Sequence, residues 1–147
     1  DTALFINRGY PFIVFDKAVK ELNKRNIPVV VHLINGLPYE TKEMMIETVK
    51  YLSNLDIQGI KIHALSILKN TELEKMYKKE KFKVLTREEY IDIVVEQLEY
   101  LREDIVINGL GFIKVSKECD VVVYTLDENI ISVRKSMIWG VLWETSK

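Results

Sequence analysis

Cysteine is nearly absent from this sequence of 147 residues, because Cys119 is the only one. A single thiol excludes an intrachain disulfide framework, a four-cysteine zinc site and any iron–sulfur cluster ligated wholly by this chain. Long apolar runs are absent too, since none approaches the ~18 residues that a membrane-spanning helix needs. Net charge is small, because 21 basic residues face 22 acidic ones. The charge balance therefore gives no global attraction to nucleic acid or to an acidic membrane surface.

The composition that remains is typical of one globular domain. Hydrophobic residues make up 48% of the chain and charged residues 29%, so the sequence can bury a core and is not disordered. Residues 1–12 contain neither an initiating methionine nor the basic segment of a signal peptide. We therefore expect a protein of the cytoplasm, and Asp1 need not be its natural start.

Two buried strands joined by a helix are the clearest pattern in the first half of the chain. Residues 15–26 carry a helical stripe of apolar residues, and residues 28–34 form an apolar, β-branched run without polar alternation. Such a run predicts a strand buried on both faces of a parallel sheet. A helical stripe follows over 42–55, and a second buried run spans 59–68. The spacing suits one strand–helix–strand unit of roughly 30 residues.

Two further helices and some weaker strands follow. Thr71 and Thr86 each precede a glutamate by three residues, which is the pattern of a capping box at a helix start. Residues 105–115 and 120–126 resemble strands, whereas 130–147 could be helix or strand. Alternating strands and helices predict the α/β class, with parallel strands and right-handed helical crossovers. Because only two strands are strongly buried, either the C-terminal strands complete the sheet or part of the sheet lies outside this chain.

The first buried strand runs directly into a turn that could hold a ligand. Ligands of α/β proteins bind at the carboxyl ends of the strands, and this strand ends at Asn35 and Gly36. Gly36 would allow a ligand to approach the backbone closely, while Pro38 would stiffen the turn. The alternative is an ordinary connection that only reverses the chain, and composition alone favours this alternative.

Three basic side chains interrupt the two apolar strands. His32 and His63 are the only histidines, and on neighbouring strands they could line a pocket, bind a metal or transfer a proton. No third ligand has matching spacing, so two partly buried histidines bonded to the main chain are the favoured interpretation. Lys61 could bind a carboxylate or phosphate at the functional end of its strand, or lie at the strand's start and reach water. The basic run at 78–83 is interrupted by Glu80, and it indicates a solvated helix end better than a nucleic-acid patch.

Three segments together resemble the second half of a radical SAM barrel. They are INRGYPF at 6–12, VVVHLINGLPYET at 29–41 and GIKIHALSILKNTELEKMY at 59–77. Within that superfamily they are most similar to the elongator/MiaB-like branch, and there to the YhcC-like bacterial radical SAM proteins. The resemblance covers residues 1 to about 108, and the order and spacing of the segments are far more specific than any one of them.

The resemblance implies an incomplete barrel, an α/β fold whose strand ends hold a 4Fe–4S cluster and S-adenosylmethionine. Reductive cleavage of S-adenosylmethionine in this family yields a 5′-deoxyadenosyl radical. The strand ending at Gly36 matches the family's glycine-containing fifth strand, and the strand from Lys61 to Leu65 matches the sixth, which lines the adenosyl moiety. By this correspondence the catalytic residues stay unassigned, and the cofactor-facing residues are Ile34, Gly36, His63 and Leu65.

The sequence departs from the family in several places. The CxxxCxxC triplet that supplies three cluster ligands is absent, so no metal ligand is assigned. Tyr10 replaces the expected histidine, Asn70 replaces a glycine, and beyond Asn108 the family pattern is not recognisable. We therefore expect residues 1–103 to form the second half of a partial barrel, and 104–147 to be a divergent C-terminal extension packed on it.

Three functions follow as hypotheses. The first is that the chain is the C-terminal portion of a radical SAM enzyme. This portion contributes to S-adenosylmethionine binding but lacks the cysteines that bind the cluster, and whether it is an enzyme by itself is left open. Its partner would be the N-terminal barrel half or a second copy of the chain. RNA is a partner only by analogy with relatives, and we expect no membrane association. The second is a non-catalytic, stand-alone α/β binding or interaction domain, with Trp139 and Trp143 as interface anchors. The third, an adenosyl-nucleotide binder without radical chemistry, is the weakest, because half a pocket buries too little of the ligand.

Overall fold

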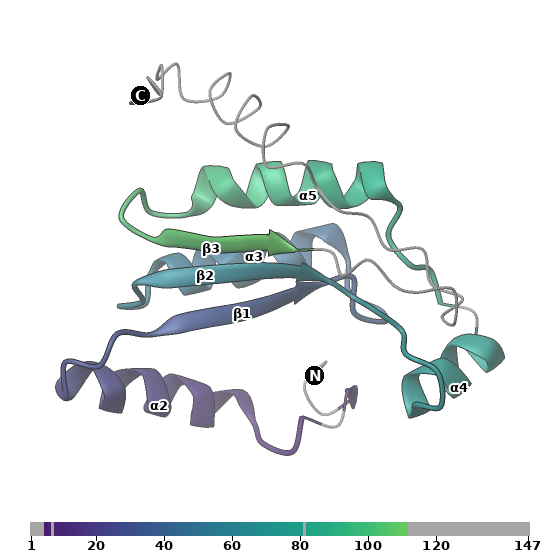
Figure 1. Ribbon diagram of the computed structural model, residues 1–147, viewed down its shortest axis with the longest axis horizontal. Coiled ribbons are helices and arrows are strands. Elements are labelled where there is room, and N and C mark those ends of the chain that lie inside the picture. Colours follow the sequence, from purple (N-terminus) through teal and green to yellow (C-terminus); the bar gives the residue numbers. More distant parts are fainter. Residues whose placement is uncertain (1–4, 7, 81, 112–147) are drawn as a thin grey trace.

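The computed structural model describes residues 5–6, 8–80 and 82–111, which form a three-stranded parallel sheet with helices beside it (Figure 1). The predicted α/β class, with parallel strands joined by helical crossovers, is confirmed. Residues 112–147, which include the predicted strand at 120–126, Cys119 and both tryptophans, lie outside the described part. Among the described helices none is both long and apolar enough to cross a membrane. The elements are α2 (Phe12–Lys24), β1 (Val30–Asn35), α3 (Lys42–Ser53), β2 (Gly59–Ala64), α4 (Glu72–Glu80), α5 (Arg87–Tyr100) and β3 (Val106–Gly111).

Strand β2 is the middle strand, with β1 on one side and β3 on the other. Its pairing with β1 is regular, from Val30 beside Gly59 to Asn35 beside Ala64. Its pairing with β3 is also parallel and contains one irregularity near the middle. Strand β3 lies in the segment 104–147, which we predict to be a separate C-terminal extension, yet it pairs with β2 in the same sheet. The boundary near residue 104 stays a prediction.

The core lies on one face of the sheet, between the strands and helices α3 and α5. Ile60 and Ile62 of β2 are fully buried there, together with Val49 of α3 and Val94 of α5. In Figure 1, α3 lies behind the sheet and no described helix passes in front of it. The described helices therefore cover the sheet on one face.

The other face of the sheet is open, which corrects the expectation of a strand buried on both faces. Along β1 burial alternates, because Val31 and Asn35 are buried whereas Val30 and Ile34 are 45% and 41% exposed. Successive side chains of a strand point to opposite faces, and the described helices pack on only one of them. We call this surface the open face. Its members in the first two strands are Val30, His32 and Ile34 of β1 and Lys61 and His63 of β2.

Helix α5 has the predicted capping box, whereas α4 has a shifted one. The Thr86 hydroxyl accepts from the Glu89 N–H at 3.2 Å, and the Glu89 carboxylate accepts from the Thr86 N–H at 2.9 Å. At α4 the Thr71 hydroxyl accepts from the Glu74 N–H at 3.2 Å, but the Glu74 carboxylate accepts from the N–H of Asn70 at 2.8 Å. Both helices thus begin where side chains satisfy free backbone N–H groups.

Helix α2 begins at Phe12, earlier than predicted, directly after Pro11. A proline suits a helix start because it lacks an N–H and fixes φ near the helical value. α2 is joined to α3 through Tyr51, whose hydroxyl donates to the Asp16 carboxylate at 2.5 Å and whose ring meets Phe12 edge-on at 5.0 Å. The hydrogen bond to Asp16 raises the pKa of Tyr51 to about 12, so this hydroxyl stays protonated at neutral pH.

Arg102 joins several backbone segments at the amino-terminal edge of the sheet. Its guanidinium donates to the carbonyls of Ser53 and Leu55 at 2.8 and 2.7 Å, and it pairs with the Asp104 carboxylate at 2.9 Å. Both carbonyls lie at or just after the end of α3, where helical C=O groups lack partners within the helix. Arg102 therefore stabilises the turn from α3 into β2.

A buried amide pair ties the end of β1 to α5. Asn35 and Gln97 are both fully buried, and each side-chain amide donates to the oxygen of the other, at 2.8 and 2.9 Å. Gln97 also donates to the Met45 carbonyl of α3 at 3.1 Å. Because buried polar groups are destabilising when unpaired, this network favours a single arrangement of β1, α3 and α5.

Replacing Gln97 by leucine should lower the free energy of unfolding by about 1–3 kcal/mol, because the buried Asn35 amide and Met45 carbonyl lose a partner. Urea unfolding followed by circular dichroism measures the change. The control is Glu99→Gln, at an exposed position of the same helix, which should change stability by less than about 0.5 kcal/mol. An unchanged unfolding midpoint for Gln97→Leu would show that the amide pair does not hold these elements together.

Candidate functional site

The carboxyl ends of β1 and β2 bring the four predicted cofactor-facing residues together. Ile34 pairs with His63 in the parallel register, and the Asn35 carbonyl accepts from the Leu65 N–H at 2.9 Å. A Cβ at Gly36 would lie 3.9 Å from the Cβ of Leu65. We call Ile34, Gly36, His63 and Leu65 the strand-end cluster.

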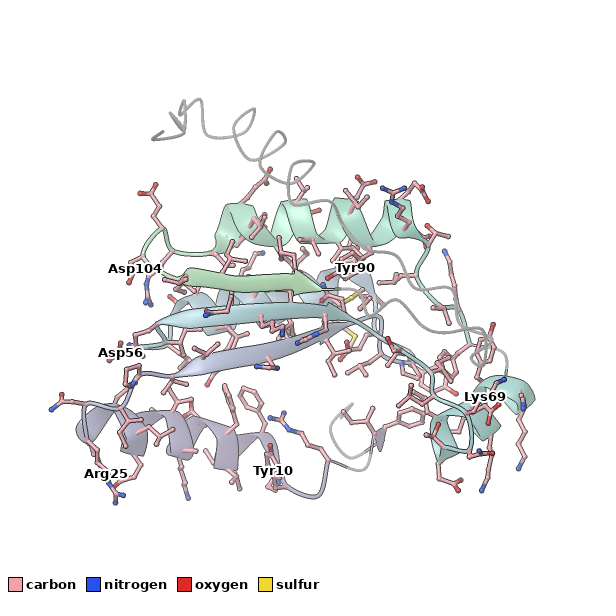
Figure 2. All side chains as sticks on the ribbon, viewed as in Figure 1. Tyr10, Arg25, Asp56, Lys69, Tyr90 and Asp104 are labelled. Carbon is pink, nitrogen blue, oxygen red and sulfur yellow. The ribbon has the colours of Figure 1, made fainter. Side chains whose placement is uncertain are left out.

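Ile34 and His63 present their side chains on the open face. Ile34 is 41% exposed, and His63 is partly buried. An exposed apolar side chain beside an imidazole offers van der Waals surface and a hydrogen-bonding group, a mixture typical of small-molecule sites. Figure 2 shows Lys69, a few residues after β2, on the side of the molecule to which the strands point, whereas Asp56 and Asp104 lie at the opposite end of the sheet.

Gly36 forms the turn after β1 under a cover of leucine. Its φ of 85° is the left-handed conformation that favours glycine, and a Cβ there would meet the Leu85 side chain at 3.0 Å. Its N–H points to the Met45 sulfur at 3.2 Å. We predict that Gly36 allows a ligand to approach the backbone, and in the structure the Leu85 side chain makes this close approach. Leu85 was not among the predicted site residues, because nothing in its own segment links it to this turn.

The rest of the turn carries an exposed aromatic pair. Tyr39 has a φ of 65° and is 63% exposed, and its ring meets Phe5 edge-on with the centroids 5.1 Å apart. Pro38, which we predict to stiffen the turn, is buried. A positive φ at a residue other than glycine is uncommon, so this turn is closely constrained.

The two histidines bond to each other, so the expectation of main-chain partners is wrong. His63 Nε2 and His32 Nδ1 are 3.3 Å apart, and the rings are tilted by 30°. Burial lowers the pKa of His63, and the neighbouring His32 and Lys61 side chains lower it further, which favours the neutral form of this ring. The part of the chain that the structure describes contains no group of three or more His, Cys, Asp or Glu side chains that could hold a metal ion.

Lys61 lies at neither end of its strand, contrary to both predicted locations. It is the third of six residues in β2, beside His32 in the register. Its side chain runs across the sheet to β3, because its Cε would lie 3.4 Å from a Cβ at Gly109. The missing side chain of Gly109 therefore leaves the space that the lysine stem occupies.

Comparison with known proteins relates this chain to longer ones. The Radical_SAM C-terminal domain family matches residues 57–137. YtqA of Bacillus subtilis is 43% identical over 109 residues, MJ0486 of Methanocaldococcus jannaschii 39% over 120, and YhcC of Escherichia coli K12 26% over 106. These alignments cover 74%, 82% and 72% of this chain, but only 34%, 37% and 34% of the relatives. The chain thus spans about a third of the length of the relatives that it matches.

A solved structure shares the fold. Archaeal Elp3 of Methanocaldococcus infernus, with an N-terminal deletion, aligns with a TM-score of 0.71 over 93% of this chain and 32% of that chain, at 19% identity. The family match, the similarity to YhcC and this shared fold confirm the resemblance to radical SAM proteins. Since the matched stretch 57–137 is more than half of the 147 residues, the chain belongs to the Radical_SAM C-terminal domain family.

Proposed function

We propose that this chain supplies the part of a radical SAM barrel that contacts the adenosyl moiety of S-adenosylmethionine. The observation that carries the proposal is the position of Ile34 beside His63, at the carboxyl ends of two paired parallel strands and on the open face. Ligands of α/β folds bind at this edge of the sheet. Ile34 and His63 would meet the ligand, while Gly36 and Leu65 shape the strand ends.

The chemistry of the strand-end cluster suits an adenosyl group. The exposed Ile34 side chain offers apolar surface for the base, and His63 Nδ1, which the bond to His32 does not use, offers one hydrogen-bond donor or acceptor for its polar edge or for the ribose. When bound in a complete site, S-adenosylmethionine supplies radical chemistry, and the protein's contribution is binding and orientation. In this proposal the N-terminal part of the barrel covers the open face, including the exposed Val30.

The described residues do not fit a 4Fe–4S cluster. They include no cysteine, because the only one in the chain is Cys119, outside the described part. A cluster with one open iron needs three protein thiolates. The ligands would therefore come from another part of a longer protein or from a second polypeptide, in line with relatives about three times as long as the aligned stretch.

S-adenosylmethionine should shift the NMR amide signals of the strand-end cluster more than those of α2 when titrated into the chain. The affinity should be weak, about millimolar, because half a pocket buries little of the ligand. Ile34→Ala should reduce the shifts at His63 and Leu65. The matched control is Ile13→Ala, since Ile13 is a 53% exposed isoleucine of α2. Shifts that are absent, or that do not concentrate at the strand ends, would refute the adenosyl site.

Reconstitution of this chain with iron and sulfide should give no 4Fe–4S absorbance. The physical reason is that a single cysteine cannot provide three thiolate ligands. A ferredoxin treated in parallel is the positive control for the reconstitution. A stable cluster that disappears in a Cys119→Ser variant would mean that the chain assembles cluster sites by some other route, such as self-association.

A further inference from the structure

The open face of the sheet carries one lysine, Lys61, and the three described strands contain no acidic residue that could pair with it. Lys61 lies on this face, beside His32 across the strand pair and two residues before His63. The sequences of β1, β2 and β3 are VVHLIN, GIKIHA and VINGLG, and they contain no aspartate or glutamate. Asp56 and Asp104 lie at the amino-terminal end of the sheet (Figure 2).

The Lys61 side chain extends along this face toward β3. Its Cε, Cγ and Cδ would lie 3.4, 3.8 and 3.9 Å from a Cβ at Gly109, so the aliphatic stem rests on the bare backbone of β3. The side chain is partly buried, and no described residue forms an ion pair with it. A partly buried charge without a partner is unfavourable unless a ligand or another chain segment completes it.

The histidine pair adds a hydrogen-bond donor to the same surface. One ring donates to the other across the 3.3 Å contact between His63 Nε2 and His32 Nδ1. In two neutral rings this bond uses one N–H and one bare nitrogen, which leaves one N–H and one bare nitrogen at the outer positions. Whichever ring donates, the pair therefore keeps one N–H that this bond does not use.

We propose that Lys61 and the His32–His63 pair form an oxyanion site on the open face, which takes the carboxylate or phosphate group of a small ligand. The ammonium supplies the charge, and the outer N–H of the histidine pair supplies a directed hydrogen bond. A metal cation does not suit this place, because Lys61 repels it and the strands offer no carboxylate. The site shares His63 with the proposed adenosyl site, but Lys61 and His32 belong to the oxyanion site alone and lie farther from the strand ends.

Phosphate titrated into the chain should shift the ring nitrogen signals of His32 and His63 saturably in NMR spectra recorded at fixed pH and ionic strength. Acetate is titrated in a parallel experiment. Tighter binding of phosphate would indicate a ligand with a phosphate group, and tighter binding of acetate a ligand with a carboxylate. Lys61→Met should weaken binding at least about tenfold, because it removes the charge but keeps the stem. The matched control is Lys17→Met, at an exposed position of α2, which should leave binding unchanged.

A second measurement uses the unmodified chain and does not rely on a variant folding. Phosphate or acetate should slow acylation of Lys61 by a water-soluble reagent, followed by mass spectrometry, while Lys17 reacts at its usual rate. The proposal is overturned if chloride causes equal shifts, if Lys61→Met binds as tightly as the unmodified chain, or if neither anion protects Lys61. The His32 ring signals and the protection of Lys61 report this site alone, because neither residue belongs to the strand-end cluster, whereas binding of S-adenosylmethionine is followed at Ile34 and Leu65.

Discussion

The in-register parallel pairing of β1 with β2 is the constraint on which the rest of the structure depends. Backbone hydrogen bonds align the strands from Val30 beside Gly59 to Asn35 beside Ala64. This alignment sets which side chains become neighbours, because a slip of one residue would move every side chain to the opposite face. It therefore places Ile34 beside His63, and it determines both proposed sites.

The two faces of the sheet differ in chemistry, and each suits a different role. The covered face is apolar around the fully buried Ile60 and Ile62, and its polar pair, Asn35 with Gln97, is fully hydrogen-bonded. The open face combines exposed apolar side chains with two histidines and a lysine. A parallel sheet is normally covered on both faces, so the open face is where the described residues can receive a ligand or another segment of a barrel. A chain that spans about a third of its relatives is consistent with such a partner segment.

Local chemistry was enough to predict the local features of the fold. The apolar run before Asn35 predicted a strand, and Thr86 with Glu89 predicted the start of α5. Ile34, Gly36, His63 and Leu65 were predicted from the resemblance to radical SAM proteins, and the structure brings them together at one edge of the sheet.

Features that depend on distant partners could not be predicted in this way. The open face of β1 reflects which helices pack against it, and an apolar run looks the same whether one face or both are covered. The Asn35–Gln97 pair joins positions 62 residues apart, and Leu85 reaches Gly36 from another segment. Lys61 extends over β3 because Gly109 leaves space there. In each case residue type and period indicate an element, but only the packing identifies the neighbour.

Disulfide trapping across the strand pair tests the central claim, that the register places Ile34 beside His63 on the open face. In a Cys119→Ser background, Ile34→Cys combined with His63→Cys should cross-link on mild oxidation, because paired strand positions on one face lie within disulfide reach. Leu33→Cys combined with His63→Cys should not, because those side chains point to opposite faces. Peptide mass spectrometry identifies the bond. Failure of the first pair to cross-link, or equally ready cross-linking of the second, would contradict the register and with it both proposed sites.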